Sequence, residues 1–123
     1  QLLAHALGAP VRRHPDPEIG WYPLHATAAG RTDQVLAALG ETAPVFQWHG
    51  CHFEVPRTAT HLARSDACEQ QAFRWGDNAY GFQFHLEMDQ PLIERWSVLA
   101  PAQASAQPAT CSALAGTMPN SRR

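Results

Sequence analysis

The alternation of apolar and polar positions is clearest between residues 71 and 85. Residues 71–75 and 79–85 have the pattern of two short strands, and Gly-Asp-Asn at 76–78 has the composition of a turn. The pattern therefore predicts a β-hairpin. Period-two alternation in its second strand places two aromatic residues on one face and three polar residues on the other: Phe82 and Phe84 against Gln83, His85 and Glu87.

Other apolar runs predict further strands. Residues 44–48 have the length of a buried strand, and residues 18–22 read as extended, with prolines on both sides. Phe53 and Val55 alternate before Pro56. We expect four aromatic side chains to belong to the core: Trp48, Phe73, Phe84 and Trp96.

Three helices are predicted from apolar spacing and from their end signals. The first covers residues 1–7 and ends at Gly8, with Leu3, Ala6 and Leu7 as its apolar face. A second covers 33–39, with Thr32 as cap, Gly40 as end, and a buried stripe of Val35, Leu36 and Leu39. A third begins at Asp89 with Pro91 in its first turn, and its apolar face is Leu92, Ile93, Trp96 and Leu99.

The two ends of the chain differ from its middle. From Pro101 onward small and polar residues dominate, too few of them large and apolar to offset the entropy of ordering. We expect a domain over residues 1–99 and a disordered low-complexity tail over 100–123. Because the first helix has no residue before Gln1 to cap it, we expect the chain to be a fragment of a longer protein.

Composition narrows the functional classes. The 123 residues are 45% apolar, enough for one domain, and carry a net charge of -2 without a basic stripe, so nucleic acid is not an expected partner. No apolar run approaches the roughly 20 residues of a membrane helix. All nine basic residues are arginines, which excludes Schiff-base chemistry. Three irregularly spaced cysteines, Cys51, Cys68 and Cys111, predict reduced thiols and a cytoplasmic protein.

His85 and Glu87 are the residues most suited to catalysis. A histidine and a glutamate two positions apart on a strand can hydrogen-bond and address one site. A nucleophile needs such a base together with a carboxylate that orients it. The alternative is an ordinary solvated strand end, and spacing alone does not separate the two interpretations.

Five short segments, taken in order, resemble one family. They are Gln1–Ala4, Glu18–Trp21, Val45–Gly50, Gln71–Arg74 and Gly81–Glu87. Together they resemble the C-terminal half of a class I (triad) glutamine amidotransferase domain, close to the free-standing relatives of the amidotransferase domain of GMP synthase. The resemblance covers about residues 1–98.

The resemblance implies a flavodoxin-like α/β sandwich with a mixed sheet, of which the N-terminal half is missing here. It also implies a Cys-His-Glu triad that hydrolyses glutamine to glutamate and ammonia, without a cofactor, for an acceptor bound by a synthetase domain or subunit. The family's His and Glu fall on His85 and Glu87. The family's Gly-x-Cys-x-Gly-x-Gln motif ends at Gln1, so the nucleophile would lie upstream. Gln1, His49 and Gly50 would bind the substrate. The alternative is a degenerate, non-catalytic module that acts only in protein interaction.

Cys51-His52 departs from the family, whose members usually have an acidic residue and then Thr or a similar group at this place. Cys51 could replace the nucleophile, but we expect no helix N-terminus behind it to lower the pKa of its thiol. His49, Cys51, His52 and His85 could bind zinc, but His-x-Cys-His lacks the paired spacing of structural zinc sites. We therefore expect a tolerated loop residue and no metal site.

Overall fold

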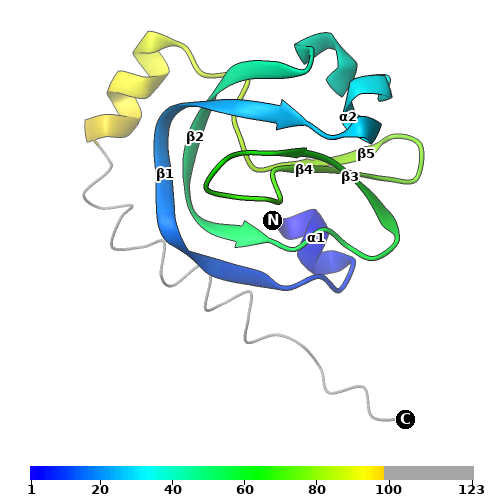
Figure 1. The fold of residues 1–123 in the computed structure, drawn as a ribbon. Helices are drawn as coiled ribbons and strands as arrows, with labels where there is room; N and C mark the ends of the chain where they lie inside the picture. Colours follow the sequence, from blue (N-terminus) through cyan, green and yellow to red (C-terminus); the bar gives the residue numbers. More distant parts are fainter. Residues whose placement is uncertain (99–123) are drawn as a thin grey trace, which may run out of the picture.

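The longest elements are two strands, β1 (Val11–Ala26) and β2 (Thr42–Phe53). In the computed structural model, which describes residues 1–98, they run side by side and curl around the shorter strands (Figure 1). The short strands are β3 (Ala59–Arg64), β4 (Ala72–Trp75) and β5 (Ala79–Phe82). The sheet order is β2-β1-β3-β4-β5, and every pairing is antiparallel. The parallel pairs of the expected mixed sheet are not among these strands.

The ladder between β1 and β2 is interrupted once. Arg13 pairs with Cys51, but the next pair is Glu18 with His49, so the register shifts and skips Gly50. Prolines at 15 and 17 lie in the intervening part of β1 and have no N–H to donate to a ladder. The sequence pattern predicts only short extended segments here. The structure joins them into two long strands, because the prolines lie at an irregularity and do not end the strand.

The predicted hairpin is confirmed. In the β4–β5 ladder, Ala72 lies opposite Phe82 at one end and Trp75 lies opposite Ala79 at the other. Gly76 in the turn has a φ of 61°, which glycine adopts readily. The strand ends at Phe82, shorter than predicted. β3 has no counterpart among the predicted strands.

The first helix, α1 (Leu2–Ala6), ends as predicted before Gly8, whose φ is 83°. Its buried residue is Ala4, while Ala6 is exposed. The predicted apolar face is therefore wrong at Ala6, although Leu3 and Leu7 do pack against the core.

The second predicted helix is wrong in its start. A short helix, α2 (Ala28–Thr32), begins earlier, and Thr27, not Thr32, accepts the capping hydrogen bond from the Gly30 N–H. The chain then leaves the helix at Asp33 and forms a 3₁₀ turn, η1 (Leu36–Leu39), before Gly40. Leu36 is buried as predicted, but Val35 is exposed.

The third helix covers residues 90–98 of the described chain. The Leu92 N–H donates to Oδ1 of Asp89 at 2.8 Å, so the predicted cap is confirmed. Trp96 packs edge to face on Trp48, with ring centroids 5.6 Å apart. Leu99 and the predicted tail lie outside the described residues. In the described part, the helices are too short or too polar to cross a membrane.

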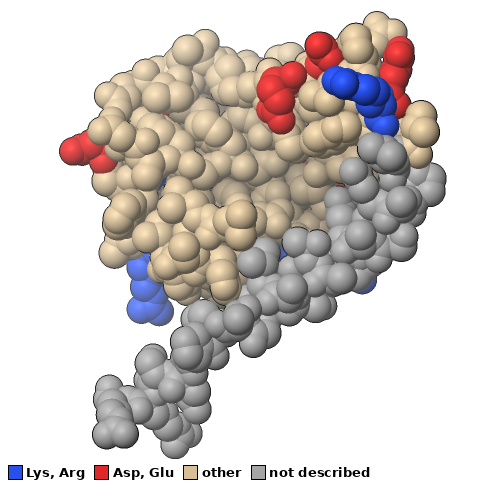
Figure 2. Space-filling model, turned by 180° about the vertical axis from the view of Figure 1, so that it is seen from behind, with Lys and Arg blue, Asp and Glu red and all other residues tan. Residues whose placement is uncertain are grey.

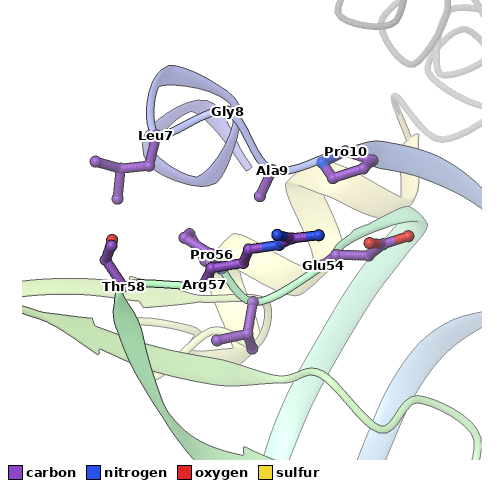
Figure 3. A pocket seen from close by; sticks show the side chains of 9 residues that line it. Leu7, Gly8, Ala9, Pro10, Glu54, Pro56, Arg57 and Thr58 are labelled. Atoms are coloured by element: carbon purple, nitrogen blue, oxygen red, sulfur yellow. The ribbon is translucent and has the colours of Figure 1, made fainter.

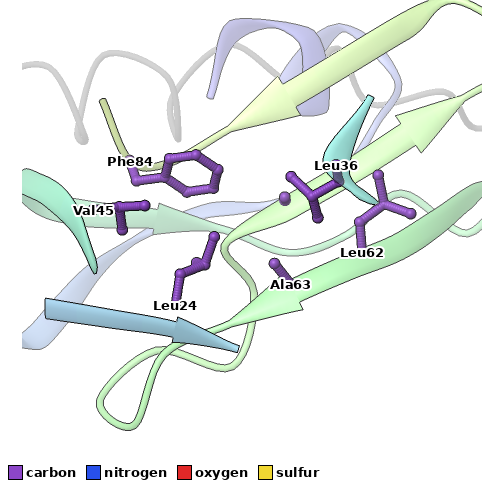
Figure 4. Close-up of a cluster of buried hydrophobic side chains, with 7 residues drawn as sticks. Leu24, Leu36, Val45, Leu62, Ala63 and Phe84 are labelled. Carbon is purple, nitrogen blue, oxygen red and sulfur yellow. The ribbon is translucent and has the colours of Figure 1, made fainter. Parts of the chain in front are cut away.

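The core consists of two apolar clusters inside the curled sheet. Figure 4 shows one of them: Leu24, Leu36, Val45, Leu62, Ala63, Ala72 and Phe84. The other surrounds Phe53 and Phe73, both fully buried and 5.1 Å apart between ring centroids. A Cβ at Gly81 would lie 2.2 Å from the Phe73 ring, so the hairpin needs glycine there. Phe73 and Phe84 are buried as predicted, whereas Trp48 and Trp96 are half-buried.

Asp33 is a buried carboxylate that joins η1 to the hairpin. Its Oδ1 accepts from the N–H groups of Val35 and Leu36, and from the Tyr80 hydroxyl at 3.1 Å. Arg74 donates to Oδ2 at 2.9 Å. Burial alone would raise the pKa of Asp33, but these hydrogen bonds and the Arg74 charge lower it below its ordinary value.

We expect Asp33→Asn to lower the free energy of unfolding of residues 1–123 by about 1–3 kcal/mol at pH 7. Because the folded pKa lies below the unfolded one, this contribution is present above the unfolded value and is lost as pH falls through the folded pKa. Urea unfolding at pH 7 and at successively lower pH should show the two proteins converging in acid. Asp66→Asn, at an exposed ion pair with His25, should change little. A difference that stays constant with pH contradicts the prediction.

Candidate active site

His85 and Glu87 lie just beyond the end of β5. The His85 N–H donates to the Phe46 carbonyl at 2.8 Å, which ties this segment to β2. Nδ1 of His85 lies 2.6 Å from Oε1 of Glu87. The predicted contact between the two side chains is confirmed. It arises from bends over residues 83–87 and not from strand alternation, because β5 stops at Phe82.

The contact fixes the chemistry of the imidazole. An ionised carboxylate only accepts hydrogen bonds, so Nδ1 carries the proton and Nε2 is the ring atom that can accept one. Burial alone would raise the pKa of Glu87, but its own backbone N–H and His85 lower it, and Glu87 is an anion near neutral pH. The Trp96 ring meets the imidazole edge to face, 5.4 Å away, and restricts its rotation. The arrangement can support general-base chemistry.

A hollow of about 500 Å³ adjoins His85. It is lined by residues of α1, β2 and the hairpin: Gln1, Leu2, Leu3, Trp48, His49, Tyr80, Gly81, Phe82, Gln83 and His85. The structure thus brings together Gln1, His49 and His85 of the predicted site. Glu87 lies behind the imidazole, and Gly50 follows His49 in β2 without lining the hollow.

His49 is buried and hydrogen-bonded on both sides of its ring. Nε2 lies 2.9 Å from Oε2 of Glu18, and Nδ1 lies 3.0 Å from the Cys51 carbonyl oxygen. Burial lowers the pKa of His49, although Glu18 and the Cys51 carbonyl act in the opposite direction. The Gln1 side chain donates to the same Cys51 carbonyl at 3.2 Å. Two predicted substrate-binding residues therefore hold one backbone position of β2.

Three polar residues beside His49 were not singled out from the sequence. Glu18, Ser65 and Gln71 are each buried to 2% exposure or less and hydrogen-bonded to one another. Glu18 and Gln71 begin two of the five family-like segments, which is the one sequence signal that marks them. Nothing in the pattern near Ser65 distinguishes it from a loop serine.

The cysteines differ from expectation. Cys51 is buried and disulfide-bonded, so the prediction of three reduced thiols is wrong for this residue. A disulfide sulfur is neither a thiolate nucleophile nor a zinc ligand, which argues against both special roles considered for Cys51. Cys68 is a free thiol whose pKa is raised by burial. In the described part of the chain, His, Cys, Asp and Glu side chains form no group of three or more suited to a metal ion.

A second hollow, of about 440 Å³, lies where the end of α1 faces the segment after β2 (Figure 3). Leu7–Pro10 line one side and Glu54–Thr58 the other. It contains none of the predicted site residues. On the face seen in Figure 2, charged side chains lie toward the margins.

The sequence model of the class I glutamine amidotransferase family matches residues 1–92. The chain is 38% identical over 94 residues to the glutamine amidotransferase-like protein YfeJ of Salmonella typhimurium. That match covers 76% of this chain and 39% of YfeJ. The chain belongs to the class I glutamine amidotransferases.

Solved structures agree with this assignment. A glutamine amidotransferase from Thermotoga maritima superimposes with a TM-score of 0.71 at 32% identity, over 95% of this chain and 50% of that protein. A GMP synthase subunit-like protein from Thermoplasma acidophilum has a TM-score of 0.63 over 89% of this chain and 56% of its own. At 23% identity, that likeness concerns the fold alone. The flavodoxin-like class I fold expected from the sequence is confirmed, and the chain spans about half or less of YfeJ and the Thermotoga protein.

Proposed function

We propose that this chain is the part of a glutaminase that carries the general base and its orienting carboxylate. The observation that supports this most directly is the 2.6 Å contact between His85 Nδ1 and Glu87 Oε1, beside a hollow that Gln1 and His49 also line. His85 is the base and Glu87 its orienter. The nucleophile is a cysteine upstream of Gln1, in a Gly-x-Cys-x-Gly-x-Gln motif that ends at Gln1.

The proposed reaction has two steps. His85 Nε2 takes the thiol proton, and the thiolate forms a bond to the carboxamide carbon of glutamine. The C–N bond then breaks, the proton passes from His85 to the leaving nitrogen, and ammonia departs from a thioester. In the second step His85 deprotonates water, whose oxygen attacks the thioester carbon; the C–S bond breaks, the proton returns from His85 to the thiolate, and the products are glutamate and the free thiol. Glu87 stays ionised and stabilises the imidazolium in both steps.

Gln1, His49 and Gly50 are proposed to position the substrate glutamine. Ammonia would go to an acceptor bound by a synthetase domain or subunit, as the family membership suggests. A cytoplasmic location remains a prediction. The same fold could serve as a non-catalytic module in protein interaction, and a measurement of ammonia release separates the two functions.

Ammonia release from glutamine should be measured for the longest protein that the gene encodes and for residues 1–123 alone. We expect turnover from the first and none above background from the second, because a base without its nucleophile and oxyanion hole activates only water. Replacing the upstream motif cysteine by serine should abolish turnover. Ammonia release by residues 1–123 alone contradicts the proposed mechanism, and an inactive longer protein with an intact motif favours the non-catalytic module.

A further inference from the structure

Glu18 is a buried acidic residue surrounded by hydrogen-bond donors. Its Oε1 accepts from the Ser65 hydroxyl at 2.8 Å, and its Oε2 accepts from the Gln71 amide at 2.8 Å. His49 meets Oε2 from a third direction at 2.9 Å. A carboxylate removed from water is retained only when such partners replace its hydration. The three partners come from β2, from the segment after β3 and from the residue before β4.

Both ring nitrogens of His49 are occupied by contacts within the protein. Its two nitrogens face a carboxyl oxygen and a carbonyl oxygen, and a neutral ring has only one N–H. A carbonyl oxygen only accepts hydrogen bonds, so Nδ1 donates to the Cys51 carbonyl and Nε2 faces Oε2 of Glu18. His49 has no ring nitrogen left for substrate, so its effect on the site passes through the backbone.

The backbone that His49 holds is the part of β2 where the ladder is interrupted. In the β1–β2 ladder, Cys51 pairs with Arg13 and His49 pairs with Glu18, while the register skips Gly50 between them. The side chains of His49 and Gln1 both approach the Cys51 carbonyl, one residue further along. These side-chain contacts restrain a stretch in which Gly50 has no register partner in β1.

We propose that Glu18 is a positioning residue for glutamine binding, acting through His49 to hold the backbone of Gly50 and Cys51 beside the hollow. The inference rests on the proposed function. Glu18 does not line the hollow, and its carboxylate is buried, so it acts at a distance. Losing it should loosen the glutamine site and leave the His85–Glu87 pair in place, because that pair is tied to Phe46 by a separate hydrogen bond.

Glu18→Gln is the discriminating variant in the longest protein that the gene encodes. It keeps the side-chain shape but leaves one acceptor oxygen for the donors of His49, Ser65 and Gln71. We expect KM for glutamine to rise about tenfold or more, with kcat changing less than about threefold. Hydrogen exchange at the Gly50 and Cys51 amides should become faster. Glu54→Gln, at an exposed ion pair with Arg12, is the matched control and should change neither.

The outcomes are separable. A wild-type protein that releases no ammonia overturns the proposed function, and this inference with it. An active wild type with an unchanged KM in Glu18→Gln overturns the inference alone, and so does a loss of kcat at constant KM, which indicates a smaller folded fraction. If Glu18→Gln does not fold, Ser65→Ala removes one donor to Glu18, together with the acceptor of the Cys68 N–H and the Gln71 amide, and should raise KM about threefold. An unchanged KM in that variant overturns the inference as well.

Discussion

Replacing His85 by Gln is expected to lower glutaminase kcat about 10³- to 10⁶-fold in the longest protein that the gene encodes. Glutamine lacks a nitrogen that can accept the thiol proton near neutral pH, while it preserves much of the packing against Trp96. KM should change far less, because substrate positioning is assigned to other residues. Steady-state ammonia release provides the measurement, with His25→Gln as a control at a surface histidine that bonds Thr42 and Asp66.

Glu87→Gln tests the proposed role of the carboxylate that contacts His85. The amide can hold the imidazole but carries no charge to stabilise the imidazolium, so we expect a smaller loss in kcat, on the order of 10²- to 10⁴-fold. Steady-state ammonia release from glutamine measures this loss, beside the same measurement for His85→Gln. If His85→Gln remains as active as the wild type, the assignment of the base is wrong.

Phe53→Ala is expected to lower the free energy of unfolding of residues 1–123 by about 3–5 kcal/mol. Phe53 is fully buried and meets Phe73 edge to face, and its removal leaves a cavity between α1 and the sheet. Part of the loss is the aromatic pair itself, worth about 0.5–1.5 kcal/mol beyond area burial. Chemical denaturation followed by tryptophan fluorescence measures the effect.

Two further variants should lose less free energy of unfolding than Phe53→Ala. Phe53→Leu refills most of the volume and should cost clearly less than Phe53→Ala, because a smaller cavity remains. Ile19→Ala, at a side chain 55% exposed on β1, should lie within about 1 kcal/mol of the wild type. Equal effects of Phe53→Ala and Ile19→Ala would show that the cluster around Phe53 does not support the fold.

Local sequence patterns predicted the features that depend on hydrogen bonds between residues close together in the chain. The hairpin follows from strand pattern and turn composition, and its Gly76 has the positive φ that such turns use. Asp89 caps the helix that begins at the next residue, by accepting from the Leu92 N–H. His85 and Glu87 meet because two positions separate them along the chain. The predicted cap at Thr32 is wrong because Thr27 caps the earlier helix α2, and Asp33 then accepts from the N–H groups of Val35 and Leu36 ahead of η1.

The sequence by itself determined the family and the contact between His85 and Glu87, since both depend on short contiguous segments. Only the tertiary structure decided how the candidate substrate site is held. Glu18 meets His49, Ser65 and Gln71 across 31, 47 and 53 residues of chain. No periodicity encodes such contacts. They exist because the curled sheet brings buried polar side chains of β1, β2 and the connection between β3 and β4 together, where hydrogen bonds to one another replace those to water.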